Sequence, residues 1–280
     1  MKVWFITGAS KGLGLAFAEA ALGRGDRVAA TARDIASLQP LEAKFGDAVL
    51  PLELDVTDRA GVAAALRRCH DVFGRLDVVV NNAGRGGVGS VEEMTEEEVR
   101  AIFESNFFGA VWVSQAALPY LRSQGYGHII QISSIAGLVA FPMVGYYNAS
   151  KFALEGLSEA LAQEVKEFGI RVTLVEPGAM RTRWAHNSMT PASAPVDTYS
   201  TQREARFESM ADEYDVNQPG DPVRAAIALL KVVDDPNPPL RLILGNGAFD
   251  IAHRHHQDRV GEWARWEDVS RGTDFPACVQ

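Results

Sequence analysis

Short apolar stretches alternate with longer stretches of helical periodicity along most of the chain. The short stretches are rich in Val and Ile, as expected of parallel strands that are covered on both faces. The predicted strands are Val3–Ile6, Arg27–Ala32, Ala48–Leu54, Leu76–Asn81, Gly127–Ile132, Ile170–Glu176 and Leu240–Leu244. The predicted helices are Leu13–Gly23, Asp58–Phe73, Glu96–Ser123, Tyr147–Phe168 and Pro222–Val233.

This alternation predicts an α/β fold, namely a Rossmann-type doubly wound parallel sheet of about seven strands with helices on both faces. The ends of the helices support the assignment. Asp58 and Thr95 are good N-caps, and Gly74, Gly125 and Gly169 follow helices at positions where C-caps belong.

Two regions interrupt this rhythm. Residues 183–220 are polar, contain three prolines and have a helix-like patch near 201–214. The tail after Gly247 predicts one helix and then an irregular end. We therefore expect a single domain over 1–280. Within it we distinguish a core (1–182), an insertion (183–220), the last core helix and strand (221–247) and a helical appendage (248–280).

Composition narrows the classes of function. Of the 280 residues, 47% are hydrophobic and 22% charged, which excludes a disordered chain. The formal net charge of −9 argues against nucleic acid as a partner. Two cysteines, Cys69 and Cys278, make no disulfide framework, and no apolar stretch approaches the roughly 20 residues of a membrane span. We expect a cytoplasmic protein without membrane contact.

A glycine-rich turn, Thr7–Gly14, directly follows the first strand and opens the first helix. Its G-x-x-x-G-x-G spacing allows a close backbone approach to a pyrophosphate, which then binds at the helix N-terminus. Taken alone, the pattern is explained equally well by an ordinary strand-to-helix turn. Its position at the start of the chain favours nucleotide binding.

Two further motifs lie where strands end. Asn81–Gly84 closes the fourth strand, at the edge where open α/β sheets bind ligands, although an Asn-rich turn explains it equally well in isolation. Tyr147 and Lys151 are four residues apart and therefore share one helix face. Ser134, thirteen residues before Tyr147, ends the fifth strand.

Together, in this order, the motifs resemble the core group of the short-chain dehydrogenase/reductase family. The resemblance covers residues 1–182 motif by motif, including Pro177-Gly178 and Thr182, and continues weakly to about residue 245. It implies an oxidoreductase that uses a nicotinamide cofactor and carries the catalytic residues Asn106, Ser134, Tyr147 and Lys151.

The resemblance implies a role for each matching residue. Tyr147 would exchange a proton with the substrate oxygen, Lys151 would lower the pKa of Tyr147 and bind the nicotinamide ribose, and Ser134, rather than Ser133, would bind the carbonyl. Asn106 would kink its helix and help to hold a water for proton relay. Asp55 and Val56 would meet the adenine. The full cofactor set is Gly8, Ser10, Lys11, Gly12, Leu13, Gly14, Arg33, Asp55, Val56, Asn82, Ala83, Gly84, Tyr147, Lys151, Pro177, Gly178 and Thr182.

Two cations favour the phosphorylated cofactor. NAD-linked relatives end the second strand with an acidic residue that binds the ribose hydroxyls. Here that position holds Ala32, with Arg33 next to it and Lys11 in the glycine turn. A guanidinium binds a 2′-phosphate through charge-assisted hydrogen bonds. We expect NADP(H), with NAD(H) or two merely solvated cations as the alternatives.

Large apolar residues near Tyr147 and in the insertion predict a lipophilic pocket. The expected substrate residues are Ser134, Phe141, Met143, Tyr147, Met180 and Trp184, with Tyr146 nearby. The insertion mixes Trp184, Met189, Tyr199, Phe207 and Met210 with polar residues, as lids often do. We interpret residues 183–220 as a lid, with an arm that contacts a neighbouring subunit as the alternative.

Other candidates predict structure rather than chemistry. His253, His255 and His256 are expected on a solvated helix face, so no metal site is predicted. Cys69 is expected to be a buried or half-buried thiol, and the acidic run Glu92–Glu98 to be a surface that complements a helix dipole.

The sequence thus predicts an NADP(H)-dependent enzyme that interconverts a carbonyl and an alcohol on a small, lipophilic substrate. An NAD-linked alcohol dehydrogenase and a non-catalytic cofactor sensor are the alternatives. Members of the family commonly pair through the helices here at Glu96–Ser123 and Tyr147–Phe168, so we expect a homodimer or homotetramer. The substrate itself and the direction of the reaction are not predicted.

Overall fold

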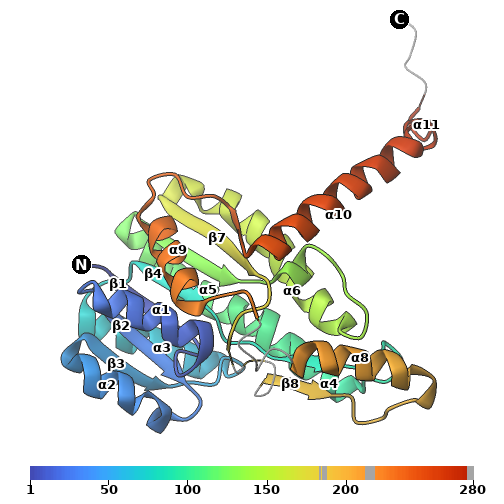
Figure 1. The fold of residues 1–280 in the computed structure, drawn as a ribbon. Coiled ribbons are helices and arrows are strands. Elements are labelled where there is room, and N and C mark those ends of the chain that lie inside the picture. Colours follow the sequence, from blue (N-terminus) through green and yellow to red (C-terminus); the bar gives the residue numbers. More distant parts are fainter. Residues whose placement is uncertain (183, 185–187, 212–217, 276–280) are drawn as a thin grey trace, which may run out of the picture.

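The computed structural model describes residues 1–182, 184, 188–211 and 218–275. Seven parallel strands form one sheet in the order β3-β2-β1-β4-β6-β7-β9 (Figure 1). They are β1 (Val3–Ile6), β2 (Arg27–Ala32), β3 (Val49–Glu53), β4 (Val78–Asn81), β6 (Gly127–Ile132), β7 (Ile170–Pro177) and β9 (Arg241–Leu244). The strand order reverses at β1 and β4, which confirms the predicted doubly wound α/β fold.

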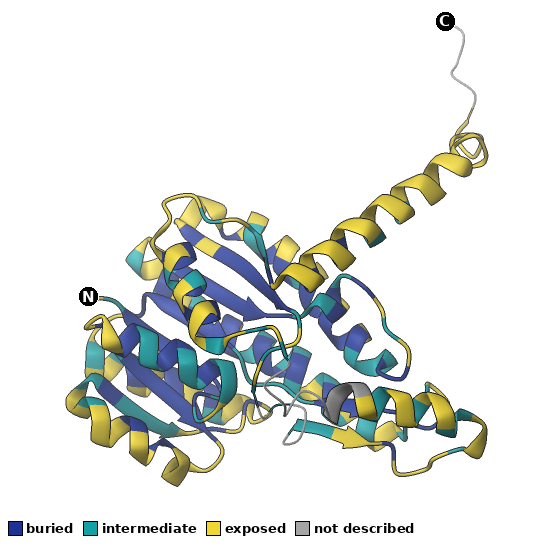
Figure 2. Ribbon diagram, viewed as in Figure 1, coloured by how far each residue is buried: buried dark blue, intermediate teal, exposed yellow. Residues whose placement is uncertain are grey.

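Alternate side chains of each strand face two helical layers. Trp4 and Ile6 belong to the core under α1 (Gly12–Gly23), α2 (Gln39–Phe45) and α9 (Pro222–Asp234). Val3 and Phe5 belong to the core under α3 (Arg59–Phe73), α5 (Gly109–Gln124) and α6 (Gly145–Glu164). The five inner strands are accordingly buried along most of their length, whereas the edge strands β3 and β9 are mostly half-buried (Figure 2).

The helix predicted over Glu96–Ser123 has three parts. It begins as α4 (Glu96–Phe103) behind a Thr95 capping box, passes through a π-helical segment (Glu104–Phe108) and continues as α5 to the left-handed Gly125. Asn106 lies within the π-helical segment, where the resemblance places a kink.

Two features have no counterpart in the prediction. The short helix α2 lies between β2 and β3, and its seven residues include a proline in the first turn, so its periodicity is weak. A second sheet pairs β5 (Gly86–Val88) with β8 (Met189–Pro191) in parallel. Three-residue strands carry too little alternation to be read from sequence.

The insertion and the tail are helical in part. The described insertion contains β8 and α8 (Ser200–Ala211), whereas residues 212–214 of the predicted helical patch lie outside the described residues. The tail forms α10 (Asn246–Arg265) and α11 (Glu267–Arg271), which project from the body of the protein and are largely exposed (Figures 1 and 2). Cys278 lies outside the described residues.

Nothing in the described ranges resembles a metal site or a membrane span. They contain no cluster of three or more metal-ligating side chains, and their helices are too short or too polar to cross a bilayer. Cys69 is buried, and burial raises the pKa of its thiol to about 12. This thiol is therefore inert at neutral pH.

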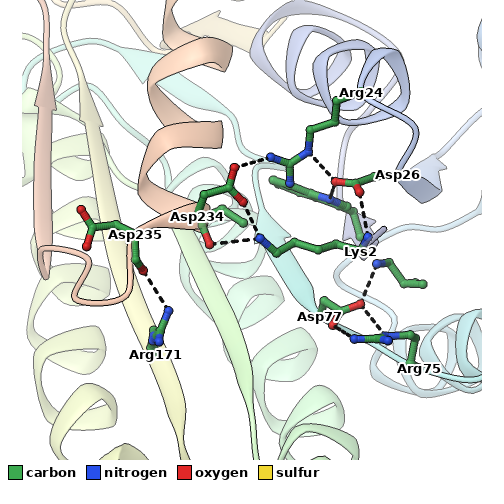
Figure 3. A network of polar contacts seen from close by, with 11 residues as sticks. Lys2, Arg24, Asp26, Arg75, Asp77, Arg171, Asp234 and Asp235 are labelled. Atoms are coloured by element: carbon green, nitrogen blue, oxygen red, sulfur yellow. Dashed lines mark hydrogen bonds and ion pairs between the residues drawn. The ribbon is translucent and has the colours of Figure 1, made fainter.

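The edge at which the strands begin holds a network of ion pairs (Figure 3). Lys2 pairs with Asp234 at the end of α9, and Arg24 pairs with both Asp234 and Asp26. The Asp77 carboxylate accepts a 2.7 Å hydrogen bond from the buried amide of Val3. This network ties the start of β1 to α9 and to β4.

Candidate active site

Backbone conformation or close packing requires glycine at three positions of the glycine turn. Gly8 and Gly12 have positive φ angles of 65° and 57°, a conformation that favours glycine. A Cβ on Gly14 would lie 2.3 Å from the carbonyl oxygen of Gly8. Asn82 braces the turn through hydrogen bonds from its Nδ2 to the carbonyls of Thr7 (2.9 Å) and Gly8 (3.0 Å). The two sequence motifs therefore form one structural unit.

Positive groups gather at this end of the site. Helix α1 begins at Gly12 without a side-chain cap, so its first amides remain available to an anion. Partial burial, together with the charge of nearby Arg33, lowers the pKa of Lys11. Asp34 lines the same cavity, and its carboxylate accepts a 3.0 Å hydrogen bond from the amide of Ala36.

Tyr147 and Lys151 come together on the first turns of α6. The Lys151 Nζ lies 5.7 Å from the centre of the Tyr147 ring and donates a 2.8 Å hydrogen bond to the carbonyl of Ile132. Lys151 is 6% exposed, and burial lowers its pKa to about 8 while the charge of Glu155 opposes this effect. The ammonium form is therefore only moderately favoured at neutral pH.

Two serines follow β6. The Ser134 Oγ accepts a hydrogen bond of 3.1 Å from the amide of Ala136 and keeps its hydroxyl proton available for another acceptor. Ser133 is 3% exposed, and its Oγ lies against Gly137 next to Glu155. Of the two, Ser134 is better disposed to donate to a molecule in the cavity.

The side chain of Asn106 is fully engaged by the protein. Its Oδ1 accepts from the amide of Arg85 (2.8 Å), and its Nδ2 donates to the carbonyl of Arg85 (2.8 Å) and to Ser150 Oγ (2.9 Å). Because Ser150 lies on α6 between Tyr147 and Lys151, Asn106 joins the π-helical segment to the helix that carries this pair.

A cavity of about 860 Å³ opens where the strands end, within the roughly 300 to 1,000 Å³ of ligand sites. It brings most of the predicted residues together. Those that line it are Gly8, Ser10, Lys11, Gly12, Leu13, Arg33, Asp55, Val56, Asn82, Ala83, Gly84, Ser134, Phe141, Tyr147, Lys151, Pro177, Gly178, Met180, Thr182 and Trp184.

Three predicted residues do not line this cavity. Gly14 lies beneath the glycine turn, and Asn106 is buried behind the wall. Met143, expected to face the substrate, is instead buried in an apolar cluster with Val88 and Val144, which removes it from the lining. Nearby Tyr146 donates to the carbonyl of Val91 at 3.1 Å and points elsewhere.

Several lining residues carry no sequence signal. Arg85 belongs to no motif, and its guanidinium lies 3.4 Å from Thr190 Oγ1. The insertion contributes further polar groups. These lining residues are Ser188, Thr190, Arg206 and Gln218. They reach the cavity only because the insertion folds back over it, which no local pattern predicts.

The insertion is fastened to the core by two acidic residues. Glu93 is 1% exposed, accepts a 2.9 Å hydrogen bond from the amide of Val196 and pairs with Arg203. Glu98 accepts a hydrogen bond from the amide of Ser193 at 2.9 Å. The prediction that the run Glu92–Glu98 is simply surface is therefore wrong for Glu93, because the insertion covers it.

The part of the insertion nearest to Tyr147 is aromatic. The Trp184 ring lies 5.3 Å from the Tyr147 ring, tilted by 49°. Phe141, Met189 and Phe207 pack around the apolar cluster of Val88, Met143 and Val144. The cavity is thus apolar beside Tyr147 and cationic beside the glycine turn.

Known proteins share this architecture. The short chain dehydrogenase family matches residues 2–192. The oxidoreductase BOA17 of Botryotinia fuckeliana is 42% identical over 276 residues, which cover 96% of this chain and 98% of that protein. A 3-ketodihydrosphingosine reductase of Bacteroides thetaiotaomicron is 38% identical over 249 residues, covering 87% of this chain and 88% of the relative.

Solved structures agree. A short-chain dehydrogenase from Streptomyces avermitilis is 41% identical, with a TM-score of 0.91, covering 98% of this chain and 100% of that one. A 3-ketoacyl-(acyl-carrier-protein) reductase from Brucella melitensis, complexed with NADH, is 25% identical (TM-score 0.75; 88% and 98% covered). An alcohol dehydrogenase from Thermococcus sibiricus, complexed with 5-hydroxy-NADP, is 27% identical (TM-score 0.71; 87% and 96%).

Proposed function

Because this chain belongs to the short-chain dehydrogenase/reductase family and is an NAD(P)-dependent oxidoreductase, we propose that it interconverts a carbonyl compound and its alcohol with NADP(H). One observation carries the proposal. A buried lysine lies against the ring of Tyr147 in a cavity that also contains Ser134 and the glycine turn. This set supplies a proton donor, a group that tunes it and a hydrogen bond for the substrate oxygen.

The residues of the cavity fit a dinucleotide. A Cβ at Gly8 would lie 3.2 Å from the Asn82 side chain, and one at Gly14 would lie 2.3 Å from the Gly8 carbonyl oxygen. Glycine at both positions lets the turn pack tightly, and its amides would then lie close to a pyrophosphate. The uncapped N-terminus of α1 favours the same anion. Pro177, Gly178 and Thr182 would hold the nicotinamide end. When bound, the cofactor supplies hydride to the carbonyl carbon, or accepts it from the alcohol.

Proton transfer is assigned to Tyr147. During reduction its hydroxyl gives a proton to the carbonyl oxygen as the carbon gains hydride, and during oxidation the phenolate takes that proton back. The Lys151 ammonium stabilises the phenolate, since opposite charges attract strongly in a dehydrated site. Ser134 donates a hydrogen bond to the reacting oxygen. Asn106 shapes the wall behind them, since its amide is wholly engaged by the protein.

The preference for NADP(H) rests on the two cations. No ion pair joins Lys11 or Arg33 to a carboxylate in the part of the chain that the structure describes. Two adjacent cations repel each other, and a 2′-phosphate between them relieves the repulsion. Ala32, which lacks an acceptor for the ribose hydroxyls, supports the same choice over NAD(H).

The substrate is proposed to be a lipophilic ketone or aldehyde. Trp184, Phe141 and Met189 surround the space beside Tyr147. We assign residues 183–220 to a lid within a single-domain protein, fastened at Glu93 and by the pairing of β8 with β5. The Bacteroides relative, named as a reductase of a 3-keto compound, supports reduction as the direction.

A panel of carbonyl compounds and alcohols, assayed with NADPH and with NADH, tests the proposal. Aliphatic and aromatic ketones are expected to oxidise NADPH faster than charged ketones of similar size. Turnover only with NADH and alcohols would instead identify an NAD-linked alcohol dehydrogenase. Binding of NADPH without turnover of any compound would identify a cofactor sensor.

We further propose a cytoplasmic homodimer or homotetramer that pairs through α4–α5 and α6. Phe152 on α6 is 36% exposed, and Phe108 and Trp112 stack 5.8 Å apart on the neighbouring helix. Sedimentation of the wild type and of a Phe152→Glu variant tests this surface. The variant is expected to sediment as a smaller species.

A further inference from the structure

Two buried carboxyl groups lie close to Lys151. Glu155 follows Lys151 by four residues on α6, so both lie on one helix face. Glu176 is the next-to-last residue of β7, and the last residue, Pro177, lines the cavity. Glu155 is 5% exposed and Glu176 is 0% exposed. Buried carboxyls are rare unless they are paired.

A single guanidinium serves both carboxyls. Arg241 of β9 pairs in register with Leu174, so its side chain lies on the face of the sheet that carries Glu176. Its Nε lies 2.9 Å from Glu155 Oε2 and 3.6 Å from Glu176 Oε1. The Nη2 of Arg241 lies 2.7 Å from Oε2 of the exposed Glu159. One cation therefore faces three acidic groups, two of them buried.

The buried oxygens of Glu176 lack donors. The Ser133 hydroxyl faces Glu155, and no other N–H or hydroxyl of the described residues hydrogen-bonds Glu155 Oε1 or either oxygen of Glu176. Burial, and then the charge of Glu155, raises the pKa of Glu176 to about 8. Burial likewise raises the pKa of Glu155, against the hydrogen bond from Ser133 and the attraction of Arg241. A proton held between the two groups would give Glu176 the hydrogen-bond partner that it lacks.

We propose that Glu155 and Glu176 share one proton and form a positioning pair whose single negative charge keeps Lys151 in its ammonium form. This inference rests on the proposed function of Lys151.

The groups that face the pair come from three segments. They are Lys151 and Glu159 on α6, Arg241 on β9, and the hydroxyl of Ser133 after β6. With one shared proton, the two cations are balanced by Glu159 and by one charge on the pair. The cluster is then neutral, which suits its burial.

Substitutions of Glu155 and Glu176 distinguish the effect of the pair's negative charge from that of its shared proton. In Glu155→Gln or Glu176→Gln, the remaining buried carboxyl no longer competes with the other for Arg241 and ionises, so one negative charge persists. In the double variant no buried negative charge remains. Lys151 then loses its proton at a lower pH, because nothing opposes the effect of burial. Glu159→Gln is the matched control, since it removes a charge from the same guanidinium that is solvent-exposed and therefore screened by water.

Infrared spectroscopy tests the shared proton without requiring turnover. At pH 7 the wild type and Glu159→Gln are expected to show the carbonyl stretch of one protonated, buried carboxyl, which each single variant loses. A wild type without this band between pH 5 and 7 would overturn the shared proton, and so would its persistence in both single variants. This readout holds even if no carbonyl substrate is found.

The pH dependence of NADPH affinity and of kcat/KM tests the effect on Lys151. The double variant is expected to move the alkaline limb of both profiles down by about one pH unit or more, while Glu159→Gln and each single variant move it little. An unmoved limb in the folded double variant overturns the positioning role. An unmoved limb in affinity is decisive even without turnover.

Discussion

The edge where the strands of the central sheet begin and the edge where they end both carry charged residues, but the charges are arranged differently. Where the strands begin, each of the cations Lys2, Arg24 and Arg75 faces a carboxylate within the network of Figure 3. Where the strands end, Lys11 lies near another cation, Arg33, and its pKa is lowered. At the first edge each of these cations is paired with a carboxylate, whereas at the second edge two cations lie near each other, where we propose that the anionic cofactor binds.

The polar groups of the two edges also differ in what they contact. The Asp77 carboxylate accepts hydrogen bonds from the buried amide of Val3 and from Arg75, so it stabilises the fold and is not available to a ligand. The Ser134 hydroxyl and the Tyr147 ring face a cavity instead. Substitutions at the first edge should therefore change stability, and those at the second should change activity.

The largest expected effect comes from Tyr147→Phe. Removing the hydroxyl removes the proposed proton donor and leaves the ring packed against Trp184. We expect kcat to fall by at least ~10²-fold, the range of general acid–base catalysis, with NADPH affinity and thermal stability close to wild type. Steady-state kinetics and a binding titration measure this.

Lys151→Met is the companion variant. It is expected to weaken NADPH binding as well as turnover, because Lys151 is proposed to contact the ribose. A Tyr147→Phe enzyme with more than half of the wild-type kcat, under conditions in which chemistry limits the rate, would contradict the assignment.

Asp77→Ala tests the opposite edge. It leaves the Val3 amide buried without an acceptor and Arg75 without its partner, which costs about 1 to 3 kcal/mol of the free energy of unfolding. Urea denaturation measures this loss. At a temperature where the variant is folded, kcat/KM should equal that of the wild type.

Asp77→Asn is its control. The amide oxygen still accepts from Val3, so the loss of stability should be clearly smaller. A tenfold loss of kcat/KM in folded Asp77→Ala would mean that the two edges are not independent.

Arg33→Ala is expected to have a somewhat smaller effect, confined to the choice of cofactor. Loss of one charge-assisted contact, about 1.5 kcal/mol, should weaken NADPH binding by ~10-fold and leave NADH binding unchanged. Lys11→Ala should act in the same direction. If the wild type binds NADH more tightly than NADPH, the preference itself is wrong.

Most of the fold could be predicted because the strands are short stretches rich in apolar residues and the helices have clear ends. The predicted strand boundaries agree with the observed ones to within two residues. The helix α2 escaped because seven residues around a proline carry little periodicity. The strand β5, with two glycines in three residues, has no alternation to detect.

The site was predictable where its residues are neighbours in sequence. Glycine turns and a Tyr and Lys four residues apart are local patterns. Contacts between distant segments were not predictable. Glu93 and Val196, like Arg241 and Glu176, meet only through the tertiary fold, and no spacing in the sequence reports their burial.

The smallest expected effect concerns pH. His128 lies near the edge where the strands begin, and its Nε2 bonds Thr173 Oγ1 at 2.9 Å. Burial, aided by the charges of Arg171 and Lys2, lowers its pKa to about 3. The unfolded chain thus takes up a proton below about pH 6.5 that the folded protein refuses, so stability is lost as the pH falls. Between pH 6.5 and 5.5 the loss is about 1 kcal/mol.

His128→Gln keeps a donor for Thr173 and cannot take up this proton. Urea denaturation at pH 6.5 and 5.5 should therefore show a difference between the two pH values that is about 1 kcal/mol smaller in the variant than in the wild type. Glu176 acts with the opposite sign: its raised pKa makes the folded state lose stability as the pH rises from about 5 to 8. If His128→Gln and the wild type lose the same free energy of unfolding between pH 6.5 and 5.5, His128 is not the group that makes the protein less stable in acid.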